Sequence, residues 1–244
     1  MFILPMTFTR RGPKENNVQP RSFLGGVFIC LTGKTKVNIW EGKVKEMERD
    51  KRYKVLPLSF YKKPTLQLAE ELIGCLLVKE TDEGIASGYI VETEAYIGPG
   101  DRAAHSFNDR RTKRTEVMFW EAGHVYTYVM HTHCLVNVVS GGRDEPEAVL
   151  IRAVEPVDGL DLMYQRRKTD KLKNLTSGPG KLTKALGISM DDYGSLFDRP
   201  PLLIAEGRKP KQISRGERIG IANSGEARHY PWRFWETDNP FVSK

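Results

Sequence analysis

The stretch GYIVETEAYIGPGDRAAHS, residues 88–106, places two carboxylates inside a run that otherwise favours a buried strand. Isoleucine, valine, threonine and tyrosine are typical of β-structure, yet Glu92 and Glu94 stand among them. Side chains alternate between the two faces of a strand, so Ile90 and Tyr96 should share a face with both carboxylates. The odd-numbered positions from 91 to 97 would then form a core-facing side.

An unpaired carboxylate is costly to bury, so these acidic side chains need a partner or a function. The turn at 98–100 follows the strand and allows His105 to return toward Tyr96. A carboxylate flanked by two flat rings is typical of a pocket for a flat ligand, where it acts as a base or stabilises positive charge. Arg152, in the strand-like VLIRAVEP, is the expected partner, and a purely structural buried ion pair is the alternative interpretation.

The sequence around this stretch predicts further elements. Apolar spacing and turn residues indicate a helix from Pro64 or Thr65 to Gly74 and a hairpin over 75–97. The segment 124–140 reads as one bent strand or a hairpin, on which Tyr126 and Tyr128 share a face and are candidates for the pocket wall. Other expected elements are a strand over 147–156, helices over 159–168 and from about Lys181, and late strands over 201–207, 217–225 and 230–237.

These elements do not alternate strictly between strand and helix, so a doubly wound parallel sheet is not favoured. The expected class is α+β: one mixed domain over 47–244, with a largely antiparallel, curved sheet and flanking helices. Residues 1–46 are basic and lack sustained periodicity, which predicts a poorly ordered extension; an accessory strand is the alternative.

Charge is unevenly distributed along the chain. Of the formal net charge of +7 in 244 residues, +6 lies within residues 1–53. Beyond them, basic residues cluster at 110–114 and 166–173, either as contacts to an anionic partner or as solvated loops. Three widely spaced cysteines predict no disulfide framework, and no run of 18 apolar residues is present, so we expect a cytosolic, non-membrane protein.

Two other motifs suggest competing chemistry. The segment HTHC, 131–134, offers two histidines on one strand face as a possible metal pair, but no third ligand stands at characteristic spacing. The segment SGPGK, 177–181, contains phosphate-loop glycines without the spacing or the Ser/Thr of a P-loop. A turn that meets a DNA phosphate through backbone N–H groups is an interpretation that stays open.

Taken together, GYIVETEAYIGPGDRAAHSF, VLIRAVEP, SGPGKLTKALGI, RIGI and PWRFW resemble the alkyladenine (3-methyladenine) DNA glycosylase family in its bacterial branch. The resemblance runs from about Leu56 to the C-terminus. It implies a mixed domain with a protruding β-hairpin and an enzyme without metal or other cofactor. Because the chemistry demands no nucleophilic lysine, we expect a monofunctional enzyme, and a monomer is the default expectation. Such an enzyme flips alkylated or deaminated purines out of double-stranded DNA and hydrolyses the N-glycosidic bond, in the bacterial cytoplasm at the nucleoid.

The resemblance also implies roles for individual residues. Glu94 would activate water, which Arg152 and the backbone carbonyl of Ile219 help to hold. Tyr96, His105 and Tyr128 would stack around the flipped base. Backbone groups of Ala103 and His105 would meet the base edge, and Asn137 would crowd a guanine 2-amino group. DNA contacts would come from Arg110, Arg111, Lys113, Arg114, Ser177, Gly178 and Lys181.

One segment departs from the family pattern. The family fills the gap left by the flipped base with an aromatic residue at the hairpin tip, whereas YTYVMHTHCLVN is one residue shorter and places Met130 and His131 there. Methionine suits an apolar wedge between base steps. Two other functions stay open at this point: a non-catalytic lesion-binding protein of the same fold, and a metal-dependent hydrolase that uses His131 and His133.

Overall fold

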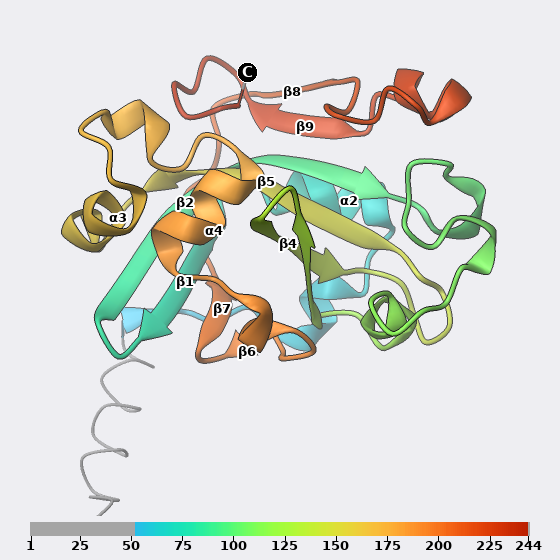
Figure 1. Ribbon diagram of the computed structural model, residues 1–244, viewed down its shortest axis with the longest axis horizontal. Coiled ribbons are helices and arrows are strands. Elements are labelled where there is room, and N and C mark those ends of the chain that lie inside the picture. The colour runs from blue at the N-terminus through green and yellow to red at the C-terminus, as the bar shows by residue number, and fades with distance from the viewer. Residues whose placement is uncertain (1–51, 244) are drawn as a thin grey trace, which may run out of the picture.

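The computed structural model describes residues 52–243, which fold around a single antiparallel sheet. The expectations for residues 1–46 lie outside this range. In the sheet of nine strands the order is β3-β4-β5-β2-β1-β7-β6, with β9 pairing with β2 and β8. Figure 1 shows these strands curving around the core, with α2, α3 and α4 packed against them. The α+β class and the curved antiparallel sheet are thus confirmed.

The elements follow the predicted order. The helices are α2 (Thr65–Glu71), α3 (Leu160–Arg167) and α4 (Pro179–Leu186). The strands are β1 (Leu76–Thr81), β2 (Gly84–Tyr96), β3 (Val125–Met130), β4 (His133–Val139), β5 (Ala148–Pro156), β6 (Asp198–Arg199), β7 (Leu202–Ala205), β8 (Ile213–Gly216) and β9 (Arg233–Glu236).

Strand β2 is the organising element because it is the longest and pairs with three neighbours, β1, β5 and β9. One side of it packs into the main core, where Ile90 and Ala95 join Leu68 of α2 and Leu72, the residue that follows this helix. The hydroxyl of Thr93 donates to the Ala69 carbonyl oxygen at 2.7 Å and ties the strand to that helix.

The predicted alternation of side chains between the two faces of β2 is wrong at one point. The pairing of β2 with β5 is irregular between Ile90 and Thr93, which is a β-bulge. The bulge carries Ile90 to the same core as Ala95, while Val91 packs with Ala153 and Phe241. Glu92 lies within this irregularity and Glu94 beyond it, yet both carboxylates contact Arg152.

The segment 124–140 is a hairpin rather than a bent strand. Strands β3 and β4 pair from Val125 with Val138 to Met130 with His133. His131 and Thr132 form the two-residue turn, both with positive φ, as in a type I′ turn. The hairpin stands free of the sheet at its tip, beside α4 (Figure 1), where Val129 is 54% and Met130 45% exposed.

The strand expected over 217–225 is wrong. The strand β8 ends at Gly216, and the chain that follows is irregular up to a 3-10 turn at Gly225–His229. Gly220 has a φ of +80°, which an extended strand does not accommodate, and the side chain of Arg218 is buried in an ion pair with Asp101. This irregular segment forms one wall of the cavity described next.

Candidate active site

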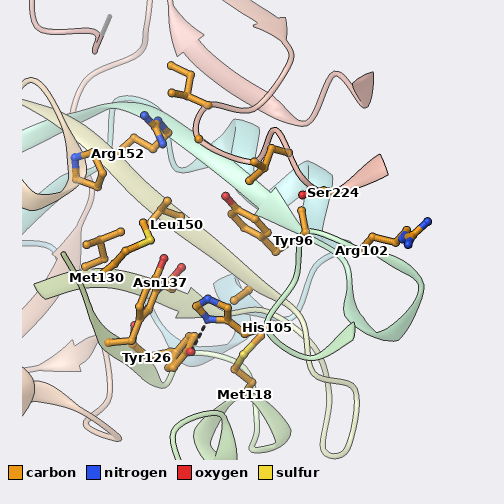
Figure 2. Close-up of a pocket in the computed structure, with 18 of the residues that line it drawn as sticks. Tyr96, Arg102, His105, Met118, Tyr126, Met130, Asn137, Leu150, Arg152 and Ser224 are labelled. Atoms are coloured by element: carbon orange, nitrogen blue, oxygen red, sulfur yellow. Dashed lines mark hydrogen bonds between the residues drawn. The ribbon is translucent and has the colours of Figure 1, made fainter. Parts of the chain in front are cut away.

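A cavity of about 490 Å³ opens between the hairpin, the loop after β2 and the loop after β8. Figure 2 shows the rings of Tyr96, His105 and Tyr126 gathered around it, with Met130 and Asn137 on the hairpin side. Its floor contains apolar residues such as Met118 and Leu150. A flat ring of two fused cycles fits a hollow of this size and lining.

The carboxylate of Glu94 lies directly behind this wall and is fully buried. Oε2 accepts a hydrogen bond of 2.8 Å from the Tyr96 hydroxyl and lies 3.2 Å from Nη1 of Arg152. Oε1 accepts the backbone N–H of Ile219 at 2.6 Å. Although Glu94 itself is not among the lining residues, all three of these partners are. The predicted Glu–Arg pair is present.

Glu92, two positions earlier, is also fully buried but belongs to a different network. Its Oε1 accepts from Nε of Arg152 at 3.0 Å and from Nε of Arg233 at 2.7 Å. Ser243 donates its backbone N–H to Oε2 at 2.8 Å and its hydroxyl to Oε1 at 2.9 Å. Arg152 therefore bridges both carboxylates. Glu92 is also bound by Arg233 and Ser243, whereas every contact of Glu94 is with a residue that lines the cavity.

The charge of Arg152 is maintained by these neighbours. Burial opposes a positive charge, yet Glu94 and Glu92 raise the pKa of the guanidinium. For Tyr96, burial together with Glu94 raises the pKa well above the usual value. Tyr96 consequently stays protonated, and its hydroxyl donates a hydrogen bond to the Glu94 carboxylate.

The aromatic wall is held together by its own contacts. Nδ1 of His105 and the Tyr126 hydroxyl are 2.8 Å apart, and the His105 ring meets the Tyr128 ring edge-on, with centroids 4.5 Å apart. Tyr126 and Tyr128 stack with centroids 5.4 Å apart, which confirms that they share a strand face. Burial, with the nearby Arg114 and Arg110, lowers the pKa of His105 to about 4, so its imidazole is neutral at pH 7.

Two further predicted base contacts also line the cavity. Asn137 on β4 is buried and donates Nδ2 to the Tyr126 carbonyl at 2.9 Å, which fixes the amide. The N–H of Ala103 donates to Asp101 Oδ1 at 3.0 Å, so this group is engaged within the loop.

At the hairpin tip, the turn separates His131 from His133, which the sequence analysis placed on one strand face. Met130 ends β3 and lines the mouth of the cavity. His131 lies in the turn with a φ of +47°, whereas His133 begins β4. The expected pairing of the two histidines on one strand face is therefore wrong, because the turn comes between them. In residues 52–243, His, Cys, Asp and Glu side chains nowhere gather in threes or more in a way that suits a metal ion.

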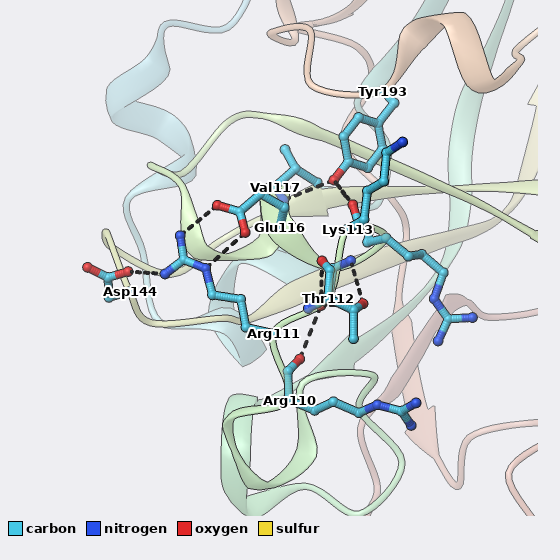
Figure 3. A network of polar contacts seen from close by, with 10 residues as sticks. Arg110, Arg111, Thr112, Lys113, Glu116, Val117, Asp144 and Tyr193 are labelled. Atoms are coloured by element: carbon cyan, nitrogen blue, oxygen red, sulfur yellow. Dashed lines mark hydrogen bonds and ion pairs between the residues drawn. The ribbon is translucent and has the colours of Figure 1, made fainter.

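The basic loop 110–114 is internally braced (Figure 3). Arg111 forms two hydrogen bonds to Glu116, of 2.9 and 2.6 Å, and another of 2.9 Å to Asp144. The Tyr193 hydroxyl accepts from the Val117 N–H at 3.1 Å and lies 3.3 Å from the carbonyl oxygens of residues 113 and 114. Within the described residues, ion pairs engage Arg111 but not Arg110, Lys113 or Arg114.

The start of α4 reaches the same region. Pro179, its first residue, lines the cavity, and Gly178 before it has a φ of +143°. A Cβ at Gly180 would come within 2.7 Å of the His133 side chain, so this glycine permits the helix to approach the hairpin. The start of α4 therefore lies near the tip of the hairpin, together with Ser177, Gly178 and Lys181.

The residues that sequence reasoning missed are Asp101 and Arg218. Both side chains are fully buried, and they form a doubly hydrogen-bonded ion pair of 2.5 and 2.9 Å. Arg218 also donates to the carbonyl oxygens of Ala95 and Ala227. The signal was a charged residue in the short apolar run RIGI, which resembles the signal that singled out Arg152. The pair joins the loop after β2 to the segment that carries Ile219.

Comparison with known proteins identifies the family. The methylpurine-DNA glycosylase profile matches residues 59–240. The chain belongs to the methylpurine-DNA glycosylase family. It is 68% identical over 189 residues to a Bacillus licheniformis protein named "Putative 3-methyladenine DNA glycosylase", covering 78% of this chain and 96% of that one.

Proteins of the same name occur in Oceanobacillus iheyensis and Listeria monocytogenes. The first is 55% identical over 198 residues, covering 81% of this chain and 100% of the relative. The second is 48% identical over 185 residues, covering 75% and 89%. As a member of this family of DNA glycosylases, the protein is a DNA repair enzyme. Within residues 52–243, none of the helices has both the length and the apolar character that a bilayer crossing requires.

Proposed function

We propose that this methylpurine-DNA glycosylase flips alkylated or deaminated purines, of the 3-methyladenine, hypoxanthine or ethenoadenine type, out of double-stranded DNA and hydrolyses the N-glycosidic bond with water activated by Glu94. The enzyme would act as a monomer in the bacterial cytoplasm, on nucleoid DNA. The observation that carries the proposal is the Glu94 carboxylate, buried and held by Tyr96, Arg152 and Ile219, each of which lines the cavity.

In this proposal the cavity holds the flipped base between aromatic rings. Tyr96 and the pair His105 and Tyr128 are the stacking surfaces, and base extrusion requires such a closely fitting pocket. A 3-alkylated adenine carries positive charge, which electron-rich rings attract. The neutral state of His105 supports this, because a protonated imidazole would repel such a base.

The hydrolytic step follows from the placement of the carboxylate. A carboxylate oxygen can accept more than one hydrogen bond, so Oε1 would accept one from the attacking water in addition to that from the Ile219 N–H. Arg152 orients Oε2, and the Ile219 carbonyl would be the second acceptor for that water. Glu94 takes the proton as the water oxygen bonds to C1′, and the electrons of the glycosidic bond leave with the base.

A monofunctional reaction is proposed because of the cavity lining. Strand cleavage by covalent catalysis needs an amine nucleophile, and none of the described residues that line the cavity is a lysine. The product would be an intact strand with an abasic site. In this proposal DNA is bound by Arg110, Lys113 and Arg114, whose loop Arg111 braces. Further DNA contacts come from Ser177, Gly178 and Lys181, and from Met130 and His131 at the hairpin tip.

The test is base release from a duplex that contains a single hypoxanthine or 1,N6-ethenoadenine. We expect release by the wild type, unaffected by EDTA, and a rate reduced at least about 100-fold in Glu94→Gln with duplex binding retained. Undiminished release in Glu94→Gln would refute the assigned base. Binding without release by the wild type would indicate a non-catalytic lesion-binding protein, and loss of activity in EDTA would indicate a metal-dependent hydrolase.

A further inference from the structure

The ring of Tyr96 has an unusual neighbour on its protein side. The guanidinium carbon of Arg218 lies 4.7 Å from the centre of the Tyr96 ring and 5.0 Å from that of Trp232. Tyr96 lines the cavity, whereas Arg218 does not and its side chain has no exposed surface. A buried cation therefore lies over this ring on its protein side, without itself lining the cavity.

A buried cation in this place would disfavour a second one. The attraction between a ring and a cation depends on the negative potential of the ring face, and Arg218 already draws on that potential. Its charge also acts through protein rather than water, so little of its repulsion is screened. A pocket backed by Arg218 alone would thus reject positively charged bases.

Asp101 removes this difficulty. Both its oxygens accept from the guanidinium, and its side chain is as fully buried as that of Arg218. The pair is consequently neutral as seen from the cavity. The remaining polar partners of Arg218 are carbonyl oxygens, which carry no net charge.

We propose that Asp101 is a specificity-determining residue: by neutralising Arg218 behind Tyr96, it allows the pocket to accept positively charged purines as well as neutral ones. The inference rests on the proposed function, since it takes the ligand against Tyr96 to be a flipped purine. Neither residue touches the base, and both act through the ring that does.

The test compares single-turnover base release from duplexes that carry a cationic lesion, 7-methylguanine or 3-methyladenine, with release from a matched duplex that carries neutral 1,N6-ethenoadenine. For Asp101→Asn, which leaves Arg218 charged, we expect the cationic-to-neutral rate ratio to fall at least about tenfold. For Arg218→Gln, which leaves Asp101 charged, the ratio should rise. The double variant should return it toward the wild-type value.

Opposite shifts in the two variants separate a charge effect from a structural one. A pair that only braces the fold would lower both rates together in either variant, with an unchanged ratio, and this result would overturn the proposal. Glu236→Gln is the matched control, because Glu236 is a buried carboxylate paired with Arg208 beside a separate hollow. Its ratio should equal that of the wild type.

Folding and activity are read out independently. Each variant is checked by its circular dichroism and thermal midpoint, and the ratio is taken only within one protein, so a partly unfolded sample lowers both rates alike. If the wild type releases neither base, the proposed function fails. If it releases both and the variants leave the ratio unchanged, only the role of Asp101 fails.

Discussion

Ser243 donates both its backbone N–H and its hydroxyl to Glu92, so that the C-terminal segment closes over a carboxylate 151 positions away in the sequence. The same hydroxyl accepts from Nη2 of Arg152 at 3.2 Å. Arg152 is thereby held on two sides, and only its Nη1 faces Glu94. The two carboxylates of the opening stretch therefore contact the arginine differently: Glu92 accepts from Nε, and Glu94 lies against Nη1.

Glu92→Gln should therefore impair catalysis, although Glu92 does not line the cavity. The change leaves Arg152 and Arg233 with less negative charge in a buried place, and we expect a destabilisation of about 3–5 kcal/mol. At a temperature where the variant is folded, kcat should fall about 10- to 100-fold through the displaced Arg152, with KM changed less. Single-turnover kinetics and denaturant unfolding measure the two effects.

Ser243→Ala is the matched control for this prediction. It removes the hydroxyl that contacts Arg152 and Glu92 but leaves the backbone N–H and all charges in place. Its loss of kcat should lie between the wild type and Glu92→Gln. A fully active, folded Glu92→Gln enzyme would show that Arg152 needs no such support.

Arg114 and Arg111 should respond differently to salt. Arg114 has no ion-pair partner among residues 52–243, so a phosphate contact there would release about one counterion. Arg114→Ala should reduce the slope of log K against log salt by about 0.9. Arg111 is engaged with Glu116 and Asp144, so Arg111→Ala should weaken binding with a smaller change in slope.

Arg199 provides the control for the salt series. It is an exposed arginine on β6, paired with Asp198, and lies outside the cavity and the basic loop. Arg199→Ala should leave both affinity and slope unchanged. Equal slopes for Arg114→Ala and the wild type would remove Arg114 from the phosphate contacts.

His105 should titrate far below the range usual for histidine. Burial, with Arg114 and Arg110 beside it, lowers its pKa to about 4, whereas the unfolded chain takes up the proton near 6.5. Between about pH 4 and pH 6.5 the unfolded state therefore binds a proton that the folded state does not bind. The free energy of unfolding should decrease as the pH falls from 6.5 toward 4. A histidine NMR titration measures the midpoint, and a value near 6.5 would contradict the buried, neutral ring.

Met130 should act as the wedge that supports the flipped base. It lies at the exposed end of β3 and also lines the cavity mouth. Met130→Ala should lower the extent of flipping, measured by the fluorescence of 2-aminopurine next to the lesion. Val129→Ala is the control, since Val129 is still more exposed and does not line the cavity. Equal fluorescence in all three proteins would exclude the wedge.

Much of the site was predictable because its signals are local. Glu94, Tyr96 and His105 lie within twelve positions of one another, and a charged residue inside an apolar run marked Arg152. The Gly-rich turns and apolar spacing likewise predicted most helices and strands. Ile219 and Asn137, in contrast, entered only through the family resemblance, since nothing in their own sequence context distinguishes them.

The features that could not be predicted depend on distant partners. The pairing of Asp101 with Arg218 spans 117 positions, and it holds the segment after Gly216 out of the strand conformation that its apolar residues favour. The bulge at Val91 arises from the fit of β2 on β5, which a two-residue period does not reveal. Local patterns therefore identified the candidate catalytic groups but not the framework that positions them.

The irregularity in β2 has a counterpart in its neighbour. Between Ile90 and Thr93 on one strand, and between Val154 and Ile151 on the other, the register slips and is then restored, so each strand passes one position without a direct partner. Removing one residue from β2 alone at this point would reverse the faces of all later side chains of that strand and direct Glu94 into the apolar core. Length changes here should be tolerated only as matched pairs, one in each strand.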